Sequence, residues 1–478
     1  MTLYEQLVDD LENLIRTGVL RPGDRMPSVR NLTRSRSVSP GTVLKAYGIL
    51  EDRGLIEARP RSGYYVARPA SATLLEPQVD APYDRSAPVR VNELVFDLLT
   101  SAMDREVVPL GSAFPSPDLY PFKRLFSALA AAARQFEPWH TMVGLAPGNY
   151  ELRRLIARRY LEVGCAIGAE EIVITSGAME ALNICLQAVT RPGDVVAVES
   201  PTFSPVLQAI EVAGLRVLGI PTDPVQGLDL QALEQALVRH PVKACLFMPN
   251  FQNPLGSLMP DEAKQALVEL LTRHQVPLIE DDVYAELYFD EDRPKPAKAF
   301  DTEGIVMHCS SFTKSLAPGF RVGWVAPGRH AEEIRRRKLI NSLSASIPAQ
   351  LAIIEYLERG GYERHLRRLR QALKTQRNRM LRAIDRYFPA QCRVTRPAGG
   401  YFLWIELPIE VDALTVHREA MAQGISVSPG PMFSAQGGFR HYLRLNFGQP
   451  WTDEVDAAMQ TLGAIIARLA LDADSATR

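Results

Sequence analysis

The stretch from Ser311 to Gly323 holds the residues best suited to covalent chemistry. It reads Ser311-Phe-Thr-Lys314-Ser-Leu-Ala-Pro-Gly-Phe-Arg321-Val-Gly, so Lys314 and Arg321 share one loop that is broken by proline and glycine. A lysine amine forms a Schiff base with an aldehyde, while hydroxyl groups and a guanidinium bind a phosphate. The stretch therefore suits pyridoxal phosphate, although a single Ser-x-x-Lys is more often ordinary surface sequence.

A second candidate site follows the strand-like run at residues 172–175. Ser176-Gly177-Ala178-Met179 comes next and begins a helical pattern. The free backbone N–H groups at a helix N-terminus attract phosphate, so Gly177, Ala178 and Met179 are candidates to hold one. The alternative is an ordinary turn between a strand and a helix.

Two further strand-like runs also end in polar residues. Asn253 precedes Pro254, which keeps it extended and lets its amide point at a ring hydroxyl or a carboxylate. Asp281 ends the run at 278–281, where a carboxylate could pair with a protonated pyridine nitrogen, and Tyr284 could reach the ring's phenolic oxygen. The alternative for this acidic segment is a helix N-cap.

These residues need an α/β scaffold to bring them together. Helical patterns alternate with β-branched runs at 172–174, 195–198, 244–248 and 278–279. This alternation predicts a mostly parallel sheet covered by helices, with ligands bound at the carboxyl ends of the strands. The last 130 or so residues hold longer, arginine-rich helices and a hairpin-like segment, which predict a smaller α+β domain.

The first 68 residues form a separate pattern. Leucines at helical spacing, a short helix after Pro27-Ser28, a third helix capped by Ser39-Pro40, and two short strand-like runs predict a winged helix-turn-helix over 1–68. Residues 69–92 are rich in Pro, Ala and Ser and predict a linker. The third unit spans residues 93–478.

The composition is that of an ordinary soluble protein, with 46% hydrophobic and 23% charged residues and a net charge of −1. No apolar run approaches the length of a membrane span, and the N-terminus resembles no signal peptide, so we expect a cytoplasmic protein without membrane contact. Five scattered cysteines without a C-x-x-C pair argue against disulfides and a metal site. Ten of the eleven cationic residues in 1–70 are arginines, which suit phosphate and guanine contacts.

Over residues 100 to 470 the order of motifs resembles the fold type I pyridoxal-phosphate proteins of the aminotransferase class I/II family. The matching motifs are Ser176-Gly177-Ala178, Glu199-Ser-Pro-Thr-Phe203, Gln252-Asn253-Pro254-x-Gly256, Asp281-Asp-x-Tyr284, Ser311-x-x-Lys314, Arg321 and Arg444. The resemblance implies a large α/β domain with a small α+β domain, and a homodimer.

The resemblance also implies a role for each matching residue. Lys314 would form the Schiff base, and Asp281 would pair with the pyridine nitrogen. The remaining cofactor contacts would be Asn253 and Tyr284 at the ring oxygen, Phe203 on the ring face, and Ser311, Arg321, Gly177, Ala178 and Met179 at the phosphate. Arg444 would hold the α-carboxylate of a substrate or effector. Two positions depart from the family pattern, because Phe203 and Val143 stand where relatives commonly carry tyrosine.

Residues 3–66 resemble the GntR-family winged helix. The matching stretches include Leu3-Tyr4-x-Gln6-Leu7, Pro22-Gly23-Asp24-Arg25-Met26-Pro27-Ser28-x-Arg30, Val38-Ser39-x-x-Thr42-Val43 and Ser62-Gly63-Tyr64-Tyr65-Val66. Fused to an aminotransferase-like domain, this is the MocR/PdxR-like arrangement.

The third helix of such a module reads double-stranded DNA in the major groove from its N-terminal end. We therefore expect Ser39, Thr42 and Lys45 to face the bases. The arginines expected to contact the DNA, by its phosphates or its minor groove, are Arg30, Arg36, Arg59 and Arg61.

Three functions remain open. The first is a transcriptional regulator that binds DNA as a homodimer and senses pyridoxal phosphate, an amino-acid-like or amine effector, or both. The second is a working aminotransferase with an accessory DNA-binding domain. The third is a structural relic with an empty pocket, which the intact Lys314, Asp281 and arginines disfavour.

Overall fold

The structure is a computed structural model that describes residues 3–59, 62–67, 74–78, 86–88, 107–134, 136–139 and 145–476. Arg61 and Val143, both singled out above, lie outside the described residues. The backbone of Arg59 is described as the end of a strand, but its side chain is not.

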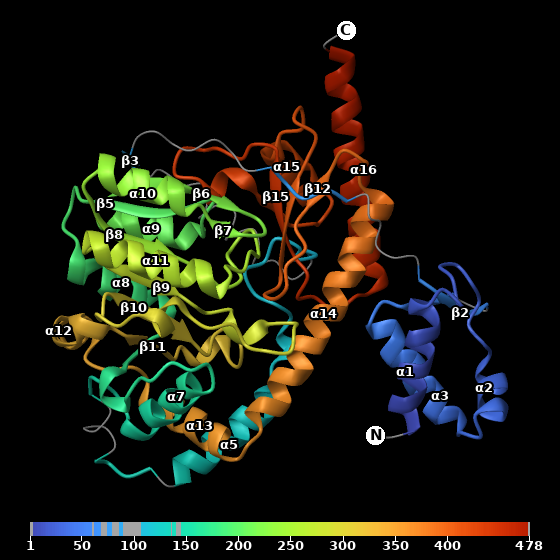
Figure 1. Cartoon of the computed structure of the whole chain (residues 1–478), viewed down its shortest axis with the longest axis horizontal. Coiled ribbons are helices and arrows are strands. Elements are labelled where there is room, and N and C mark those ends of the chain that lie inside the picture. The colour runs from blue at the N-terminus through green and yellow to red at the C-terminus, as the bar shows by residue number, and fades with distance from the viewer. Residues whose placement is uncertain are drawn as a thin grey trace.

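The N-terminal module is a winged helix-turn-helix, as the sequence predicts (Figure 1). Its elements are α1 (Leu3–Arg16), α2 (Val29–Ser35), α3 (Pro40–Asp52), β1 (Ile56–Arg59) and β2 (Gly63–Val66). Both short helices begin at a serine N-cap, because Ser28 and Ser39 accept hydrogen bonds from the N–H groups of Asn31 and Thr42 at 3.2 and 3.1 Å. The helices pack on a small core that includes Leu7, Leu11, Val43, Tyr47 and Leu50.

The large domain is built on a sheet that has nine strands among the described residues, in the order β3-β6-β5-β8-β9-β10-β11-β4, with β7 paired to β6. The strands are β3 (Ala87–Pro88), β4 (Val173–Thr175), β5 (Val195–Ser200), β6 (Arg216–Asp223), β7 (Gly227–Leu228), β8 (Val242–Phe247), β9 (Leu278–Asp281), β10 (Val306–Ser311) and β11 (Gly323–Ala326). The run from β6 to β10 is parallel, and β3, β7, β11 and β4 pair antiparallel. The sheet is therefore mixed: the predicted parallel run forms its centre, and antiparallel strands extend it on both sides.

Helices cover both faces of this sheet because its central strands are apolar on both sides. Val196 and Val198 of β5 pack on one side with α8 and α9, while Val195 and Ala197 pack on the other side with α10 and α11. The helices of this domain are α5 (Phe122–Arg134), α7 (Tyr150–Leu161), α8 (Ala178–Val189), α9 (Ser204–Val212), α10 (Leu230–Arg239), α11 (Asp261–His274), α12 (Ala331–Ser342) and α13 (Ile347–Glu358).

The small domain is an antiparallel sheet in the order β12-β13-β15-β14 with three helices. Its elements are α14 (Tyr362–Tyr387), β12 (Arg393–Val394), β13 (Phe402–Glu406), α15 (Ala413–Ala422), β14 (Ser428–Pro429), β15 (Tyr442–Asn446) and α16 (Asp453–Ala476). The long helix α14 runs diagonally from the large domain toward the winged helix (Figure 1). There Arg382 donates to the Gly54 carbonyl at 3.4 Å, which is a contact between the two units.

Two described pieces of the predicted linker lie against the rest of the chain. The Leu75 carbonyl accepts from the N–H of Val394 at 2.9 Å, and the N–H of Gln78 donates to Glu406 at 2.8 Å. Ala87 and Pro88 form β3 at the edge of the large sheet. Among the described helices, none combines the length and apolar character that a bilayer span requires.

Candidate functional site

Lys314 lies in the turn that follows β10 and contacts a segment that is distant in the sequence. Its side chain is buried, and its Nζ donates to the Ala113 carbonyl at 3.0 Å and lies 3.9 Å from the centroid of the Phe114 ring. The N–H groups of Leu316 and Ala317 both bond the Phe312 carbonyl at 2.9 Å, which closes the turn. The amine is thereby held in the buried region where the large and small domains meet, which we call the cleft.

Burial changes the chemistry of this amine. It lowers the pKa of Lys314 to about 7, with Arg444 and Arg321 lowering it further and Asp281 opposing them. Since the neutral amine is the nucleophile, a large share of Lys314 is ready to attack an aldehyde at neutral pH.

We therefore expect the rate at which the cofactor-free protein captures pyridoxal phosphate to depend on pH with a midpoint near 7. Below that pH the neutral share of Lys314 falls about tenfold per pH unit, so the rate falls with it. Above the midpoint the rate levels off. Stopped-flow absorbance of the freshly mixed protein and cofactor measures this profile, and a rate that keeps rising up to pH 10 would contradict it.

Asp281 ends β9, which pairs with β10, the strand that leads into the same turn. It is 1% exposed, and its Oδ1 has no hydrogen-bond partner. Burial raises its pKa to about 7, Asp282 adds to the effect, and Lys314 opposes it. A buried carboxylate oxygen without a donor is costly, so this position suits a ligand that brings an N–H group, such as a protonated pyridine.

The next residue, Asp282, belongs to a buried network of hydrogen bonds next to the site. It accepts from Asn250 at 2.9 Å and lies 3.0 Å from His308 Nε2, and the other ring nitrogen of His308 lies 2.7 Å from the Tyr160 hydroxyl. Sequence reasoning missed His308 and Tyr160. Two consecutive aspartates could have indicated this network. Successive residues of a strand point to opposite faces, so only one of the two can face the cleft and the other needs partners behind it.

Asn253, Tyr284 and Arg444 meet on one side of the cleft. Asn253 donates to the Tyr284 hydroxyl at 3.4 Å and accepts from the Arg444 guanidinium at 3.1 Å. The three side chains are buried and come from three separate segments of the chain. The structure thus brings these predicted residues together.

Arg444 is a buried cation that faces no carboxylate among the described residues. It donates to the carbonyls of Gly111 and Ser112 and to the Ser428 hydroxyl, while its Nε has no partner. Burial lowers its pKa to about 10. A buried guanidinium without an anion is expensive, so the site suits a ligand carboxylate, which binds a guanidinium through two parallel hydrogen bonds.

The N-terminus of α8 and Arg321 form a cup suited to a phosphate. Gly177 has a left-handed backbone (φ +89), and a Cβ added there would lie 2.4 Å from a terminal nitrogen of Arg321. Arg321 also bonds the Ser176 carbonyl at 3.1 Å, and α8 has no side-chain N-cap, so the N–H groups of Ala178 and Met179 remain available. Only glycine leaves room for the guanidinium here.

The two remaining predicted cofactor contacts are Ser311 and Phe203. Ser311 is buried, and its hydroxyl accepts from the Thr313 N–H at 3.3 Å, which leaves its own hydrogen free to donate. Phe203 precedes α9 and is partly buried between the cores of the two domains.

Sequence reasoning missed the segment that covers the cleft. The carbonyls of Gly111, Ser112 and Ala113 accept from Arg444 and Lys314, and Tyr401 also bonds the Ala113 carbonyl at 3.0 Å. These contacts use backbone oxygens, which carry no sequence signature.

On the winged helix, the N-terminal end of α3 is open to a ligand. Ser39 and Lys45 are exposed, Thr42 is half-buried, and Lys45 lies 3.7 Å from the centroid of the Tyr4 ring. Leu44 is 49% exposed on the same helix, where its methyl groups could contact a thymine methyl. Sequence reasoning missed Leu44 because a leucine in a helix is usually buried.

The predicted arginines differ in their surroundings. Arg30 is exposed, whereas Arg36 pairs with Asp10 at 2.8 Å with both side chains about half exposed. Such surface pairs contribute about 0 to 1 kcal/mol, so a phosphate could replace Asp10 as the partner of Arg36.

Two family profiles match the chain. The family described as aminotransferase class I and II matches residues 107–462, and the bacterial regulatory proteins of the gntR family match residues 3–66. Together they cover both units described above.

Two relatives match over nearly the full chain, and a third matches over about three quarters of it. The Escherichia coli (strain K12) protein named as the uncharacterized HTH-type transcriptional regulator YdcR is 46% identical over 98% of this chain and 99% of its own length. The regulator YjiR of the same organism is 40% identical over the same shares. The Thermus thermophilus 2-aminoadipate transaminase is 30% identical over 77% of this chain and 92% of its own.

A solved structure matches about four fifths of the chain. The Thermus thermophilus α-aminoadipate aminotransferase LysN, complexed with N-(5'-phosphopyridoxyl)-L-leucine, has a TM-score of 0.73 and 29% identity and covers 79% of this chain and 95% of its own.

Proposed function

Because this chain belongs to the aminotransferase class I and II family and carries a GntR-type winged helix ahead of that domain, we propose that it is a pyridoxal-phosphate-binding transcriptional regulator. The observation that carries this proposal is the 46% identity to a regulator along nearly the whole chain, winged helix included. The aminotransferase relatives align with the C-terminal unit and are more distant.

The residues of the cleft fit the cofactor of this family. Lys314 would hold its aldehyde carbon, the unpartnered Oδ1 of Asp281 would accept from the pyridine nitrogen, and the cup of Gly177 and Arg321 would hold the phosphate. When bound, pyridoxal phosphate supplies an electron sink for amino groups. Arg444, which faces no other carboxylate among the described residues, would orient the carboxylate of an amino-acid-like effector.

The DNA is bound by a homodimer in this proposal. One winged helix makes few phosphate contacts and binds weakly at cellular salt, so a regulator gains affinity by placing two modules on two half-sites. An effector that binds one conformation better than another then changes DNA affinity by that difference. The regulator acts in the compartment that holds the DNA, the cytoplasm.

An active aminotransferase remains the second candidate, on one specific observation. The buried amine of Lys314, the acid Asp281 and the cation Arg444 are all in place in one cleft. The Lys314 amine, once it is no longer bound to the cofactor, would act as the base and acid that moves a proton to or from the substrate Cα. Rapid turnover of amino acid and 2-oxo acid pairs without sequence-selective DNA binding would favour this candidate over the regulator.

Replacing Arg30 or Arg36 by alanine is expected to weaken binding to the DNA upstream of the protein's own gene. Each variant should lose about one phosphate's share of the salt dependence, which lowers the slope of log K against log salt by about 1. Thr42→Ala, at the base-facing end of α3, should cost about 1 to 3 kcal/mol and relax sequence preference. Fluorescence anisotropy at several salt concentrations measures these quantities.

Arg16→Ala is the matched control, because Arg16 ends α1 and bonds Asn13 of its own helix at 3.2 Å. If all the variants bind the DNA with the affinity and salt slope of the control, α3 is not the reading helix. If the parent protein itself shows no preference for any upstream sequence, the regulatory function is wrong.

A further inference from the structure

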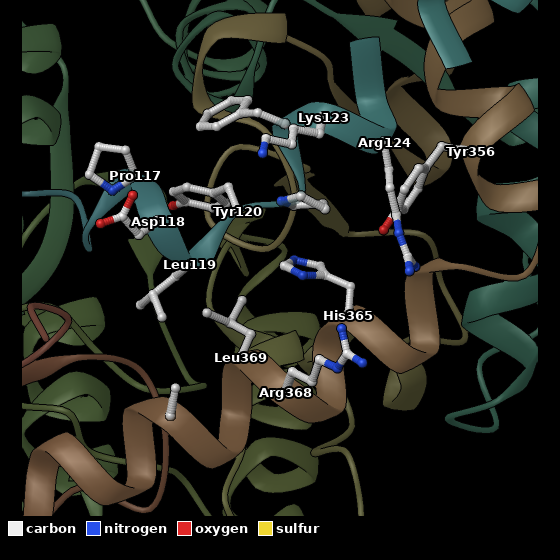
Figure 2. A pocket seen from close by; sticks show the side chains of 13 residues that line it. Pro117, Asp118, Leu119, Tyr120, Lys123, Arg124, Tyr356, His365, Arg368 and Leu369 are labelled. Carbon is white, nitrogen blue, oxygen red and sulfur yellow. The ribbon is translucent and has the colours of Figure 1, made fainter. Parts of the chain in front are cut away.

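A second cavity lies outside the cofactor cleft, between the start of α5, α13 and α14. Its volume is about 620 Å³. Tyr120, Phe122, Tyr356 and Leu369 form apolar walls, and the basic lining residues come from α5 and α14 (Figure 2). Lys314, Asp281 and Arg444 do not line this cavity, so it is not part of the site described above.

Its charges are unbalanced. Lys123, Arg124 and Arg368 line the cavity, and none of them forms an ion pair with a described residue, whereas Asp118 is its only acidic lining residue. Figure 2 shows the guanidinium groups of Arg124 and Arg368 at one end, from two different helices, and the Asp118 carboxylate at the other. Two guanidinium groups without a carboxylate between them attract an anion.

Tyr120 and His365 separate this cavity from the cofactor cleft and connect it to the lysine turn. The Tyr120 hydroxyl donates to the Thr313 carbonyl at 3.5 Å, and His365 Nε2 lies 2.8 Å from the Ser315 carbonyl, so that nitrogen carries the hydrogen. His365 is 8% exposed and lies in the middle of the cavity in Figure 2. A molecule bound here would therefore touch residues that hold both neighbours of Lys314.

We propose that this cavity binds a small organic dianion, a dicarboxylate or a phosphate monoester, at a site separate from the cofactor. Arg124 and Arg368 clamp one acidic group from opposite walls, Lys123 serves the second, and the aromatic and leucine walls cover the carbon body. The volume is in the range of pockets that hold small ligands.

Calorimetric titration of the full-length protein loaded with pyridoxal phosphate tests this site. The probes are glutarate and inorganic phosphate, used separately at constant ionic strength, and the background variant is Arg444→Ala, which removes the carboxylate site of the cofactor cleft. We expect one probe molecule to bind per chain in this background. The added double change Arg124→Ala with Arg368→Ala should weaken binding by at least about tenfold, or 1.4 kcal/mol.

Two further variants make the result decisive. Arg367→Ala removes an exposed arginine of the same helix that does not line the cavity, and it should leave affinity unchanged. Arg124→Lys with Arg368→Lys keeps the charge but not the planar fork, and it should bind with intermediate affinity. Binding of glutarate but not phosphate would identify a dicarboxylate site. Binding of phosphate but not glutarate would identify a phosphate-ester site.

Three outcomes would overturn the proposal. They are no heat with either probe, equal affinity in the arginine double variant, and an equal loss in Arg367→Ala, which would mean general attraction to a basic helix. DNA binding by the same preparations is a separate measurement, so failure of this site and failure of the regulatory function are distinguishable.

Discussion

Replacing Lys314 by alanine is expected to abolish covalent attachment of pyridoxal phosphate. The Lys314 amine is buried in the cleft with a pKa lowered to about 7, whereas an exposed lysine keeps its charge and reacts slowly with aldehydes. Visible absorbance after gel filtration should disappear in the variant. Borohydride reduction followed by peptide mass spectrometry should find the label on the Lys314 peptide in the parent protein and nowhere in the variant.

The matched control is Lys243→Ala, which removes an exposed lysine of β8 and should keep the full absorbance band. The phosphate cup and Asp281 survive in Lys314→Ala, so the variant should still bind the cofactor without a covalent bond and release it on dialysis. A stable band that survives dialysis of Lys314→Ala would assign the attachment to another lysine.

Sequence reasoning located the parts of the cleft that the chain encodes locally. Asp281 and Asn253 stand at or just beyond the ends of neighbouring parallel strands, β9 and β8, and such strand ends meet at one edge of the sheet. Gly177 could be anticipated for a similar reason, since it joins a strand to a helix. These positions can be predicted from the alternation of strand-like and helical patterns along the sequence, without knowledge of long-range packing.

Other parts of the cleft depend on contacts that the sequence does not encode. Lys314 bonds the carbonyl of Ala113, which is remote in the chain, and any residue type supplies a carbonyl. The same reason explains the predicted linker, where the Leu75 carbonyl pairs with the backbone of Val394. A composition of Pro, Ala and Ser carries no helical period, and it does not predict where backbone groups bind.

The two adjacent aspartates also have different roles, which the Asp-Asp motif alone does not predict. Asp281 and Asp282 are adjacent and both buried, yet one has an unpartnered oxygen in the cleft while the other is engaged by Asn250 and His308. Only the three-dimensional register of β9 against β10 places His308 within reach of Asp282. The fold, and not the Asp-Asp motif, therefore decides that Asp281 Oδ1 has no hydrogen-bond partner.

Replacing Gly177 by alanine is expected to weaken pyridoxal phosphate binding by about 100-fold, while the backbone strain at this positive φ lowers the free energy of unfolding by about 1 to 3 kcal/mol. The new Cβ would lie 2.4 Å from a terminal nitrogen of Arg321, and that flexible guanidinium is the group that can move. Its departure removes hydrogen bonds to a charged group, each contributing about 1.5 to 3 kcal/mol. Equilibrium titration of the cofactor-free protein, together with thermal unfolding, measures both effects.

Two comparisons isolate the cause of that loss. Gly193→Ala places a side chain at another left-handed glycine (φ +92) with nothing within 4 Å, so it carries the backbone strain without the clash and should retain cofactor affinity. Arg321→Ala should lose as much affinity as Gly177→Ala, and the double variant should lose no more than either, since both act through one guanidinium. Additive losses would mean that Gly177 and Arg321 hold the phosphate independently, and that the alanine disturbs the N-terminus of α8 instead.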